Sequence, residues 1–246
     1  MNTKKIGIYG LGRFGLFWAD LLSQDFEVIG YNRTERDFRG ITLGSREEVL
    51  SCNALFFCVS ISSMKEVLQQ CATHIGRDTV VFDTCSVKCY PAGLMQEMLP
   101  PETQIIATHP MFGPDSGRNG VAGLPLVFSP LQADEQTQGF WRDYFLSIGL
   151  DVLEMTPEEH DREAAVTQGI THVIGRVLGG LDLGPSRIGT LGYRKILEVV
   201  EQTCNDPYQL FMDLQHYNPY THSMRLRLKE SLEEVMRALE EADSAL

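Results

Sequence analysis

Long apolar runs are the first thing that this sequence of 246 residues lacks. No stretch of about 18 uncharged apolar residues is present, which excludes a helix that spans a membrane. The polar N-terminus shows no apolar signal segment, so we expect a cytoplasmic protein. The six cysteines lack the paired CxxC pattern of a zinc site, and we therefore expect reduced thiols and no bound metal.

Positive charge is also scarce. The net charge of −12 argues against nucleic acid or an anionic membrane as a partner. The acidic excess is uneven, because residues 1–40 hold six Lys/Arg and five Asp/Glu whereas the remaining residues hold 15 and 28. An anionic ligand therefore needs cations placed close to it, and Arg13, Arg33 and Arg36 lie in the balanced N-terminal segment.

That segment opens with an apolar strand, Ile6 to Tyr9, followed at once by a glycine turn and an apolar-rich helix. Gly10, Gly12 and Gly15 fit the pattern G-x-G-x-x-G. The first glycine permits a tight turn, the second lets the backbone approach a pyrophosphate, and the third lets the helix pack on the strand. Unpaired N–H groups at the helix start attract an anion. We expect a dinucleotide site here rather than a plain turn.

The end of the next apolar strand, Glu27 to Tyr31, lacks the acidic residue that usually accepts a hydrogen bond from the ribose of NAD. Asn32 holds that position, and Arg33 and Thr34 follow it. An arginine pairs with a 2′-phosphate that a carboxylate would repel, so we expect NADP, the alternative being that Arg33 is only a solvated charge. The predicted cofactor residues are Gly10, Gly12, Arg13, Phe14, Gly15, Asn32, Arg33, Thr34, Ser60 and Ser62.

Strand and helix patterns alternate as far as residue 154, which predicts an α/β fold with a Rossmann-type, doubly wound, mostly parallel sheet. After the buried strand Asn53 to Val59 come small polar residues, where Ser63 either lines the cofactor or caps the next helix. Further strands are expected at 79–83, 104–108, 124–128 and 152–154.

The strand pattern stops after Thr156-Pro157, a Thr cap followed by a proline at the helix start. We expect a long helix to about Leu181 and then further helices, interrupted near 184–185, 206–207 and 218–219. The predicted domains are a dinucleotide-binding domain at 1–155 and a smaller all-helical domain at 156–246. An apolar stripe on the last helix packs either across a homodimer or within the chain.

Reactive side chains follow the strands of the predicted sheet, where ligands bind in an open parallel sheet. His109 comes directly after a strand, and its near-neutral pKa suits proton transfer coupled to hydride transfer. Ser86 follows the preceding strand and either bonds the same hydroxyl or caps a helix. On the long helix, Gln168, His172 and Arg176 share a face, and they either close a substrate pocket or form a buried polar cluster.

Five segments occur in one order: G-L-G-R-F-G, D-T-C-S-V-K, T-H-P-M-F-G-P-D-S-G-R-N-G, E-E-H-D-R-E-A-A and T-Q-G-I-T-H-V-I-G-R. Together they strongly resemble the prephenate/arogenate dehydrogenase family of tyrosine biosynthesis, from about residue 5 to residue 222. The likeness is greatest to its plant-type, NADP-using branch, which also has a counterpart of the segment D-P-Y-Q-L-F that starts at Asp206.

The resemblance implies an oxidative decarboxylation of arogenate or prephenate, in which hydride leaves a ring carbinol carbon and the ring carboxylate leaves as CO2. His109 matches the catalytic histidine of the family and Ser86 its partner, while Gln168 and His172 match substrate-pocket positions. Bacterial members commonly carry a carboxylate-binding arginine where this chain has Glu198, so Lys88, Arg118 and Arg176 become the candidate anchors.

An acidic residue near the pocket would favour the ammonium of arogenate over the ketone of prephenate, and Asp206 is one candidate. Two alternatives to this activity are another NADP-dependent reductase, of the imine or 3-hydroxy acid type, and a non-catalytic NADP sensor. The reductases usually place Lys or Asp on the long helix, where this chain has Gln168 and His172.

Overall fold

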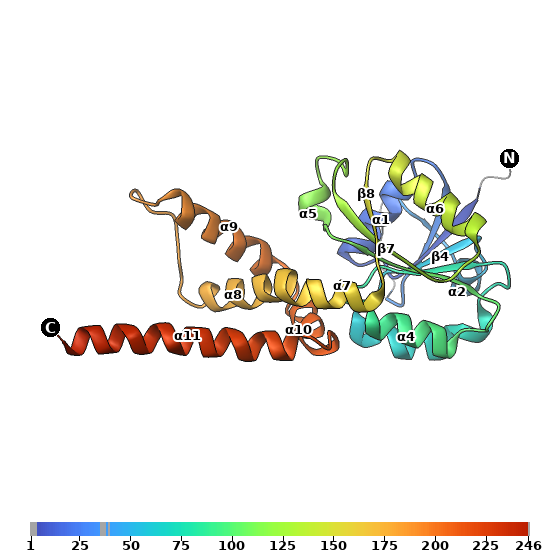
Figure 1. Cartoon of the computed structure of the whole chain (residues 1–246). Helices are drawn as coiled ribbons and strands as arrows, with labels where there is room; N and C mark the ends of the chain where they lie inside the picture. The colour runs from blue at the N-terminus through green and yellow to red at the C-terminus, as the bar shows by residue number, and fades with distance from the viewer. Residues whose placement is uncertain (1–3, 35–37, 39, 246) are drawn as a thin grey trace. The chain divides into compact units, whose positions relative to one another are not determined.

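A computed structural model describes residues 4–34, 38 and 40–245 of the chain (Figure 1). Contacts between Cα atoms divide it into a first unit, residues 1–160, and a second unit, residues 161–246, which we describe separately. The predicted boundary between 155 and 156 lies five residues before this division. Arg36, one of the cations noted in the sequence, lies outside the described residues.

The first unit is built on one eight-stranded sheet with the order β3-β2-β1-β4-β5-β6-β7-β8. Neighbouring strands are parallel except for β6 and β7, which run antiparallel. Such a sheet, nearly all parallel and wound in two directions from β1, is the predicted doubly wound fold. The strands are β1 (Lys5–Tyr9), β2 (Glu27–Tyr31), β3 (Thr42–Leu43), β4 (Ala54–Phe57), β5 (Val80–Asp83), β6 (Gln104–Pro110), β7 (Pro125–Gln132) and β8 (Asp151–Glu154).

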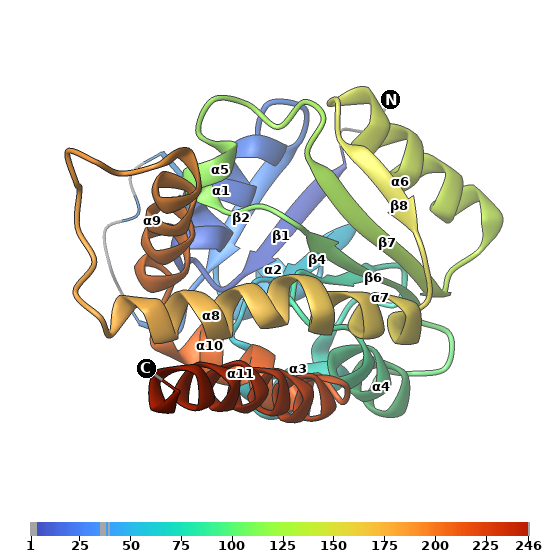
Figure 2. The same cartoon turned by 60° about the vertical axis from the view of Figure 1, so that its left-hand side comes forward.

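Helices cover both faces of this sheet (Figure 2). Alternate strand residues point to opposite faces: Phe56 packs with helices α1 and α6, whereas Leu55 and Phe57 pack with α2, α3 and α4. Two buried faces explain why the strands read as continuous apolar runs. The helices are α1 (Arg13–Leu22), α2 (Arg46–Leu50), α3 (Met64–Cys71), α4 (Cys89–Met98), α5 (Pro114–Gly117) and α6 (Glu135–Ser147), with 3-10 turns η1 (Ile61–Ser63) and η2 (Ala72–His74).

The segment around His109 differs from the expectation in two ways. Strand β6 continues to Pro110 because its pairing with β7 places His109 opposite Val127. The following glycine- and proline-rich segment, expected as a loop, contains the short helix α5. Helix α5 is held near α1, since Arg13 forms two hydrogen bonds of 2.7 and 2.8 Å with the carboxylate of Asp115.

Helices make up the regular structure in the described part of residues 157–245. They are α7 (Pro157–Ala164), which crosses the division between the units, a π-helical turn η3 (Ala165–Gly169), α8 (Ile170–Gly179), α9 (Leu191–Asn205), α10 (Tyr208–Tyr217) and α11 (Thr221–Ser244). A close approach joins α8 to α9, because a Cβ atom at Gly175 would lie 2.0 Å from Thr203 Oγ1. Helices α9 and α10 end at Asn205 and Tyr217, next to the interruptions predicted at 206–207 and 218–219, and α8 ends at Gly179, five residues before the one predicted at 184–185.

Helix α11 carries large apolar side chains on its surface. Leu232, Val235, Met236 and Leu239 are each about half exposed, and their spacing places them on one stripe of the helix. Among the described residues, no helix is both long enough and apolar enough to cross a membrane.

Candidate active site

The glycine turn between β1 and α1 has the shape that a bound pyrophosphate requires. Gly10 has a φ of +104°, and a Cβ atom there would lie 2.5 Å from the carbonyl oxygen of Cys58. A Cβ atom at Gly15 would lie 1.9 Å from the Gly10 carbonyl oxygen, so this glycine lets α1 pack on the turn. Gly12 faces no protein atom within 4 Å of such a position, which leaves its surface open to a ligand.

Asn32 ties the end of β2 to this turn. Its Oδ1 accepts a hydrogen bond of 3.1 Å from the Leu11 N–H, and its Nδ2 donates one of 2.8 Å to the Thr34 carbonyl. The Gly10 N–H also donates to the Tyr31 carbonyl over 2.8 Å. The residue that stands in the usual acidic position therefore orders the turn and presents Arg33 and Thr34.

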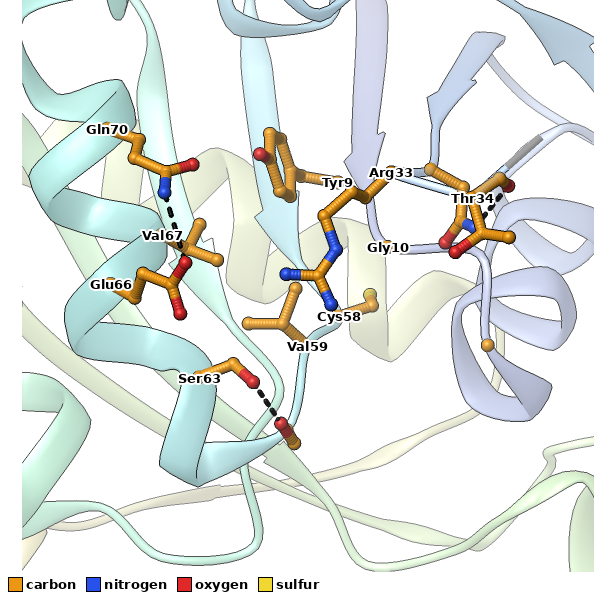
Figure 3. A pocket seen from close by; sticks show the side chains of 13 residues that line it. Tyr9, Gly10, Arg33, Thr34, Cys58, Val59, Ser63, Glu66, Val67 and Gln70 are labelled. Carbon is orange, nitrogen blue, oxygen red and sulfur yellow. Dashed lines mark hydrogen bonds between the residues drawn. The ribbon is translucent and has the colours of Figure 1, made fainter.

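A cavity of about 220 Å³ opens beside these residues (Figure 3). The side chain of Arg33 extends into it, and this exposed guanidinium makes no hydrogen bond or ion pair with the described residues. The hydroxyl of Ser63 lies 2.6 Å from that of Ser60 and does not cap α3, so both hydroxyls line the cavity. The lining residues are Tyr9, Gly10, Gly12, Asn32, Arg33, Thr34, Cys58, Val59, Ser60, Ser63, Glu66, Val67 and Gln70.

Six of the ten predicted cofactor residues line this cavity: Gly10, Gly12, Asn32, Arg33, Thr34 and Ser60. The other four are not part of its lining. Arg13 is paired with Asp115, Phe14 stacks on Trp18 at 5.7 Å, Gly15 supports the turn, and Ser62 hydrogen-bonds Ser60 over 3.5 Å. Helix α3 contributes Glu66, Val67 and Gln70, which the sequence did not suggest because an amphipathic surface helix has the same pattern.

His109 is buried near the carboxyl end of β6, the end at which β1, β4 and β5 also finish. Its Nδ1 lies 2.8 Å from Nε2 of His160, which is buried as well, and the ring planes meet at 71°. The pKa of His109 is well below its usual value, first because burial opposes the charged form and then because His160 and Lys88 repel it. His109 is therefore neutral at rest and able to accept a proton.

The sequence did not suggest His160 as a partner of His109. Its position follows from a capping box at the start of α7, in which Thr156 Oγ1 accepts from the Glu159 N–H over 3.2 Å and Glu159 accepts from the Thr156 N–H over 2.8 Å. The segment E-E-H-D contains this histidine, and that shared segment was the available signal.

Lys88, which lowers the pKa of His109, is fully buried. Its ammonium group forms an ion pair with Asp83 and donates to the Thr108 carbonyl over 2.6 Å. Asp83 also accepts from the backbone N–H groups of Cys85 and Thr108, so the ends of β5 and β6 are joined. A lysine with these partners and no exposed surface does not fit the predicted role of substrate-carboxylate anchor.

Ser86 and Arg118, two other predicted site residues, have different environments. The Ser86 hydroxyl is buried and has no hydrogen-bond partner among the described residues, as expected of a group that awaits a ligand. Arg118 follows α5 and is exposed, with no ion pair to any residue in the described ranges. Ser86 and His109 form no hydrogen bond with each other in the described structure.

In the second unit, the predicted substrate residues form a partly unsatisfied polar cluster. Gln168 Oε1, His172 Nδ1 and Arg176 Nε are buried without a hydrogen-bond partner among the described residues. His172 Nε2 lies 3.9 Å from the Asp206 carboxylate, and Arg176 Nη2 donates to the Asp206 carbonyl over 2.6 Å. Burial lowers the pKa of His172 more than Asp206 raises it, so His172 is neutral.

A doubly wound sheet with an open glycine turn, a cavity beside it and a neutral buried histidine at the same sheet edge defines a dinucleotide-dependent dehydrogenase. Residues 34–138 match the family model of the prephenate dehydrogenase nucleotide-binding domain, and residues 177–245 match that of the TYRAAT1-like C-terminal domain. The chain belongs to the arogenate/prephenate dehydrogenase family.

Two relatives from Arabidopsis thaliana support this assignment. Arogenate dehydrogenase 2, chloroplastic, is 33% identical over 97% of this chain and 70% of its own length. Arogenate dehydrogenase 1, chloroplastic, is 35% identical over 87% of this chain, which spans only 36% of that relative. The fold is similar to that of prephenate dehydrogenase from A. aeolicus in complex with hydroxyphenyl propionate and NAD+, with a TM-score of 0.75 and 16% identity over 99% of this chain and 93% of the other.

Proposed function

We propose that this protein catalyses the NADP-dependent oxidative decarboxylation of arogenate to tyrosine, with prephenate as the second candidate substrate. The observation that carries the proposal is His109, a neutral buried histidine at the sheet edge that also holds the glycine turn. The names of the two Arabidopsis relatives support arogenate dehydrogenation as the reaction.

His109 is the general base in this proposal. Its unprotonated nitrogen accepts the proton of the ring hydroxyl, which makes the carbinol carbon a better hydride donor. The Ser86 hydroxyl, buried and unpartnered, orients the same oxygen. When bound, NADP supplies the nicotinamide that takes up the hydride.

The residues around the cavity fit NADP. A side chain at Gly12 would occupy the space that the open turn leaves for the pyrophosphate. Arg33 and Thr34 line the cavity where the adenosine ribose is expected, and no Asp or Glu stands at the end of β2 to repel a 2′-phosphate. We therefore assign the 2′-phosphate to Arg33 and Thr34, with Ser60 and Ser63 as further cofactor contacts.

Gln168, His172 and Arg176 are assigned to the substrate because each keeps a buried polar atom unsatisfied. Arg176 is the candidate anchor for a carboxylate: its guanidinium stacks on Tyr208 and Phe211 at 5.6 and 5.7 Å, and its Nε is available. Arg118 is a second candidate because it is exposed and follows α5. We no longer assign Lys88 to the substrate, because it is fully buried and paired with Asp83. Its proposed role is to position Ser86 and His109.

Arogenate is favoured over prephenate by Asp206. Its carboxylate lies near His172 and its backbone carbonyl holds Arg176, so an anion stands within the proposed substrate cluster. An anion stabilises the ammonium group of arogenate and offers nothing to the ketone of prephenate. Asp206→Asn should lower kcat/KM for arogenate more than for prephenate.

A homodimer through the helical domain, residues 156–246, completes the proposal. The stripe Leu232, Val235, Met236 and Leu239 leaves four large apolar side chains about half exposed on one helix. A surface of this kind is typical of an interface between subunits.

The test is a steady-state comparison of arogenate and prephenate, each with NADP and with NAD. We expect the highest kcat/KM for arogenate with NADP. His109→Ala should retain NADP binding and lose about 10²- to 10⁴-fold in turnover, the usual scale for a positioned base. No reduction of either dinucleotide by wild-type protein with either substrate would favour the non-catalytic sensor, and turnover of an imine or a 3-hydroxy acid would favour a reductase.

A further inference from the structure

His109 and His160 form a buried pair. The proposed reaction uses His109 but gives no role to His160. The two ring nitrogens, Nδ1 of His109 and Nε2 of His160, are 2.8 Å apart, which is a hydrogen-bond distance. Both side chains are at least 95% buried, so water does not replace this contact. The ring centroids are 5.0 Å apart at a steep angle, which is not a stacked arrangement.

One hydrogen atom lies between these two nitrogens. Which nitrogen it is covalently bound to determines whether Nε2 of His109 is able to accept a proton. If His160 donates it, His109 carries its own hydrogen on Nε2 and has no lone pair there for a substrate proton. If His109 donates it from Nδ1, the Nε2 lone pair is free. Nε2 makes no hydrogen bond to a described residue, so it is the nitrogen left for a ligand.

We propose that His160 is a positioning residue that accepts a hydrogen bond from His109 Nδ1, keeps Nε2 of His109 unprotonated, and stabilises the imidazolium that forms when His109 takes up the substrate proton. This inference rests on the proposed function for its chemistry. A serine-protease triad uses a carboxylate to hold the tautomer of its histidine. Here an imidazole stands in the corresponding position, so no permanent negative charge makes His109 more basic at rest.

In the oxidative decarboxylation, the histidine pair holds the substrate proton only temporarily, and all atoms and electrons are accounted for. The ring hydroxyl loses its proton to Nε2 of His109 while hydride, a proton with two electrons, leaves the carbinol carbon for the nicotinamide. The bond between the ring and its carboxylate then breaks, CO2 departs, and that electron pair completes the aromatic ring. The resulting phenolic oxygen takes the proton back from Nε2, so the overall reaction releases no proton.

Burial explains why a second imidazole is needed. Burial and the Lys88 ammonium oppose the transient positive charge on the His109 ring, and a positively charged His160 would oppose it too. His160 stabilises the imidazolium only in its uncharged form, with its Nε2 lone pair directed at His109. The Asp83 carboxylate, at the end of the neighbouring strand β5, is already bonded to Lys88 and to two backbone N–H groups. The lone pair of His160 Nε2 gives the imidazolium a charge-assisted hydrogen bond instead.

The position of His160 is well determined by its surroundings. The capping box of Thr156 and Glu159 fixes the start of α7, the helix that carries His160. Within this first turn, the His160 N–H donates to the Thr156 carbonyl over 3.0 Å. The Met155 carbonyl accepts a hydrogen bond of 2.5 Å from Ser129 Oγ on β7, the strand that pairs with β6. Both histidines are therefore fixed to the same pair of strands, which supports a permanent contact.

Three variants test the proposal kinetically. His160→Leu removes the acceptor and should lower kcat about 10- to 100-fold, the range of one hydrogen bond to a charged group, with KM for substrate and NADP changed less than about threefold. His160→Gln places an amide oxygen near the position of Nε2 and should recover most of that loss. His74→Leu, a matched change at an exposed histidine of the same unit, should have no effect. A kcat of His160→Leu within about twofold of wild type would overturn the proposal.

A measurement without substrate or cofactor separates this inference from the proposed function. In uniformly ¹⁵N-labelled wild-type protein, the imidazole resonances of His109 report which ring nitrogen carries hydrogen, and His109→Ala assigns them. We expect hydrogen on Nδ1 and none on Nε2. Hydrogen on Nε2 would refute the assigned tautomer even in an active enzyme. An expected spectrum together with inactivity toward both substrates would instead refute the proposed function alone.

Discussion

Truncation of Arg33 is the perturbation that isolates the choice between NADP and NAD. The exposed guanidinium makes no hydrogen bond or ion pair with the described residues, so Arg33→Ala removes no polar contact within that part of the chain. We therefore attribute a selective loss of NADP affinity to the missing contact between Arg33 and the ligand. NAD differs from NADP only in the missing 2′-phosphate, and the variant should bind NAD as wild type does.

The size of the effect follows from the exposure of the site. A hydrogen bond to a charged group contributes about 1.5–3 kcal/mol, and solvent around Arg33 places this contact at the lower end. About 1.5–2 kcal/mol corresponds to a Kd for NADP that is about 10- to 30-fold higher. Since exposed charges are screened by salt, raising ionic strength from about 0.1 M to about 1 M should weaken NADP binding to wild type and change the variant much less.

Isothermal titration of NADP and NAD into the protein without substrate measures both constants. Arg77→Ala removes the same charge from an exposed loop that precedes β5, at the opposite edge of the sheet, and should leave both constants unchanged. Asn32→Asp is the converse variant: it retains an acceptor for the Leu11 N–H and adds a carboxylate near the ribose, so it should favour NAD. Equal losses for NADP and NAD in Arg33→Ala would refute the assignment of the 2′-phosphate.

Three further predictions concern stability and assembly. Lys88→Met leaves Asp83 as an unpaired buried charge and should lower the unfolding free energy by about 3–5 kcal/mol in a denaturant titration; a loss below about 1 kcal/mol would contradict the buried pair. The pKa of His109 is lowered in the folded state, so the unfolded state binds the additional proton and stability should fall as pH decreases below about 6.5, by at most about 1.4 kcal/mol per pH unit, with a shallower slope in His109→Ala. Val235→Glu should convert a dimer to a monomer in light scattering, whereas Arg237→Glu, an exposed charge reversal on the same helix, should not; an unchanged mass for both variants would remove α11 from the interface.

Local signals explain what could be predicted from the sequence. The glycine turn, the buried strands and the helix interruptions at proline depend on residues that are neighbours in the chain, and the structure has them at the expected positions. The family could be recognised because each of the five segments that carry the resemblance is continuous in the sequence. The alternation of buried residues between the two sheet faces also follows from the two-residue period of a strand.

Contacts between distant residues explain what could not be predicted. From the sequence, Lys88 is predicted to be a cation that binds the substrate carboxylate. The structure shows that it is paired with Asp83 and donates to the Thr108 carbonyl. His160 stands 51 residues after His109 and is indistinguishable in sequence from a surface residue of an acidic helix start. The antiparallel pairing of β6 and β7 has the same cause, because it depends on how the chain returns after α5.

The π-helical turn Ala165–Gly169 has a consequence for how the helix from Pro157 to Gly179 tolerates change. Such a turn amounts to one residue more than an α-helix would use, and it lies between the start of the helix and the pair His172 and Arg176. The turn absorbs this extra residue, so deleting one residue from it should restore regular α-helix and leave the later side chains on nearly the same face. A deletion at Ile170 or Thr171, in the regular helix α8, would instead turn every later side chain by about 100° around the axis. A single-residue deletion in the π-helical turn should therefore retain more turnover than a deletion at Ile170 or Thr171, with helical content preserved in both.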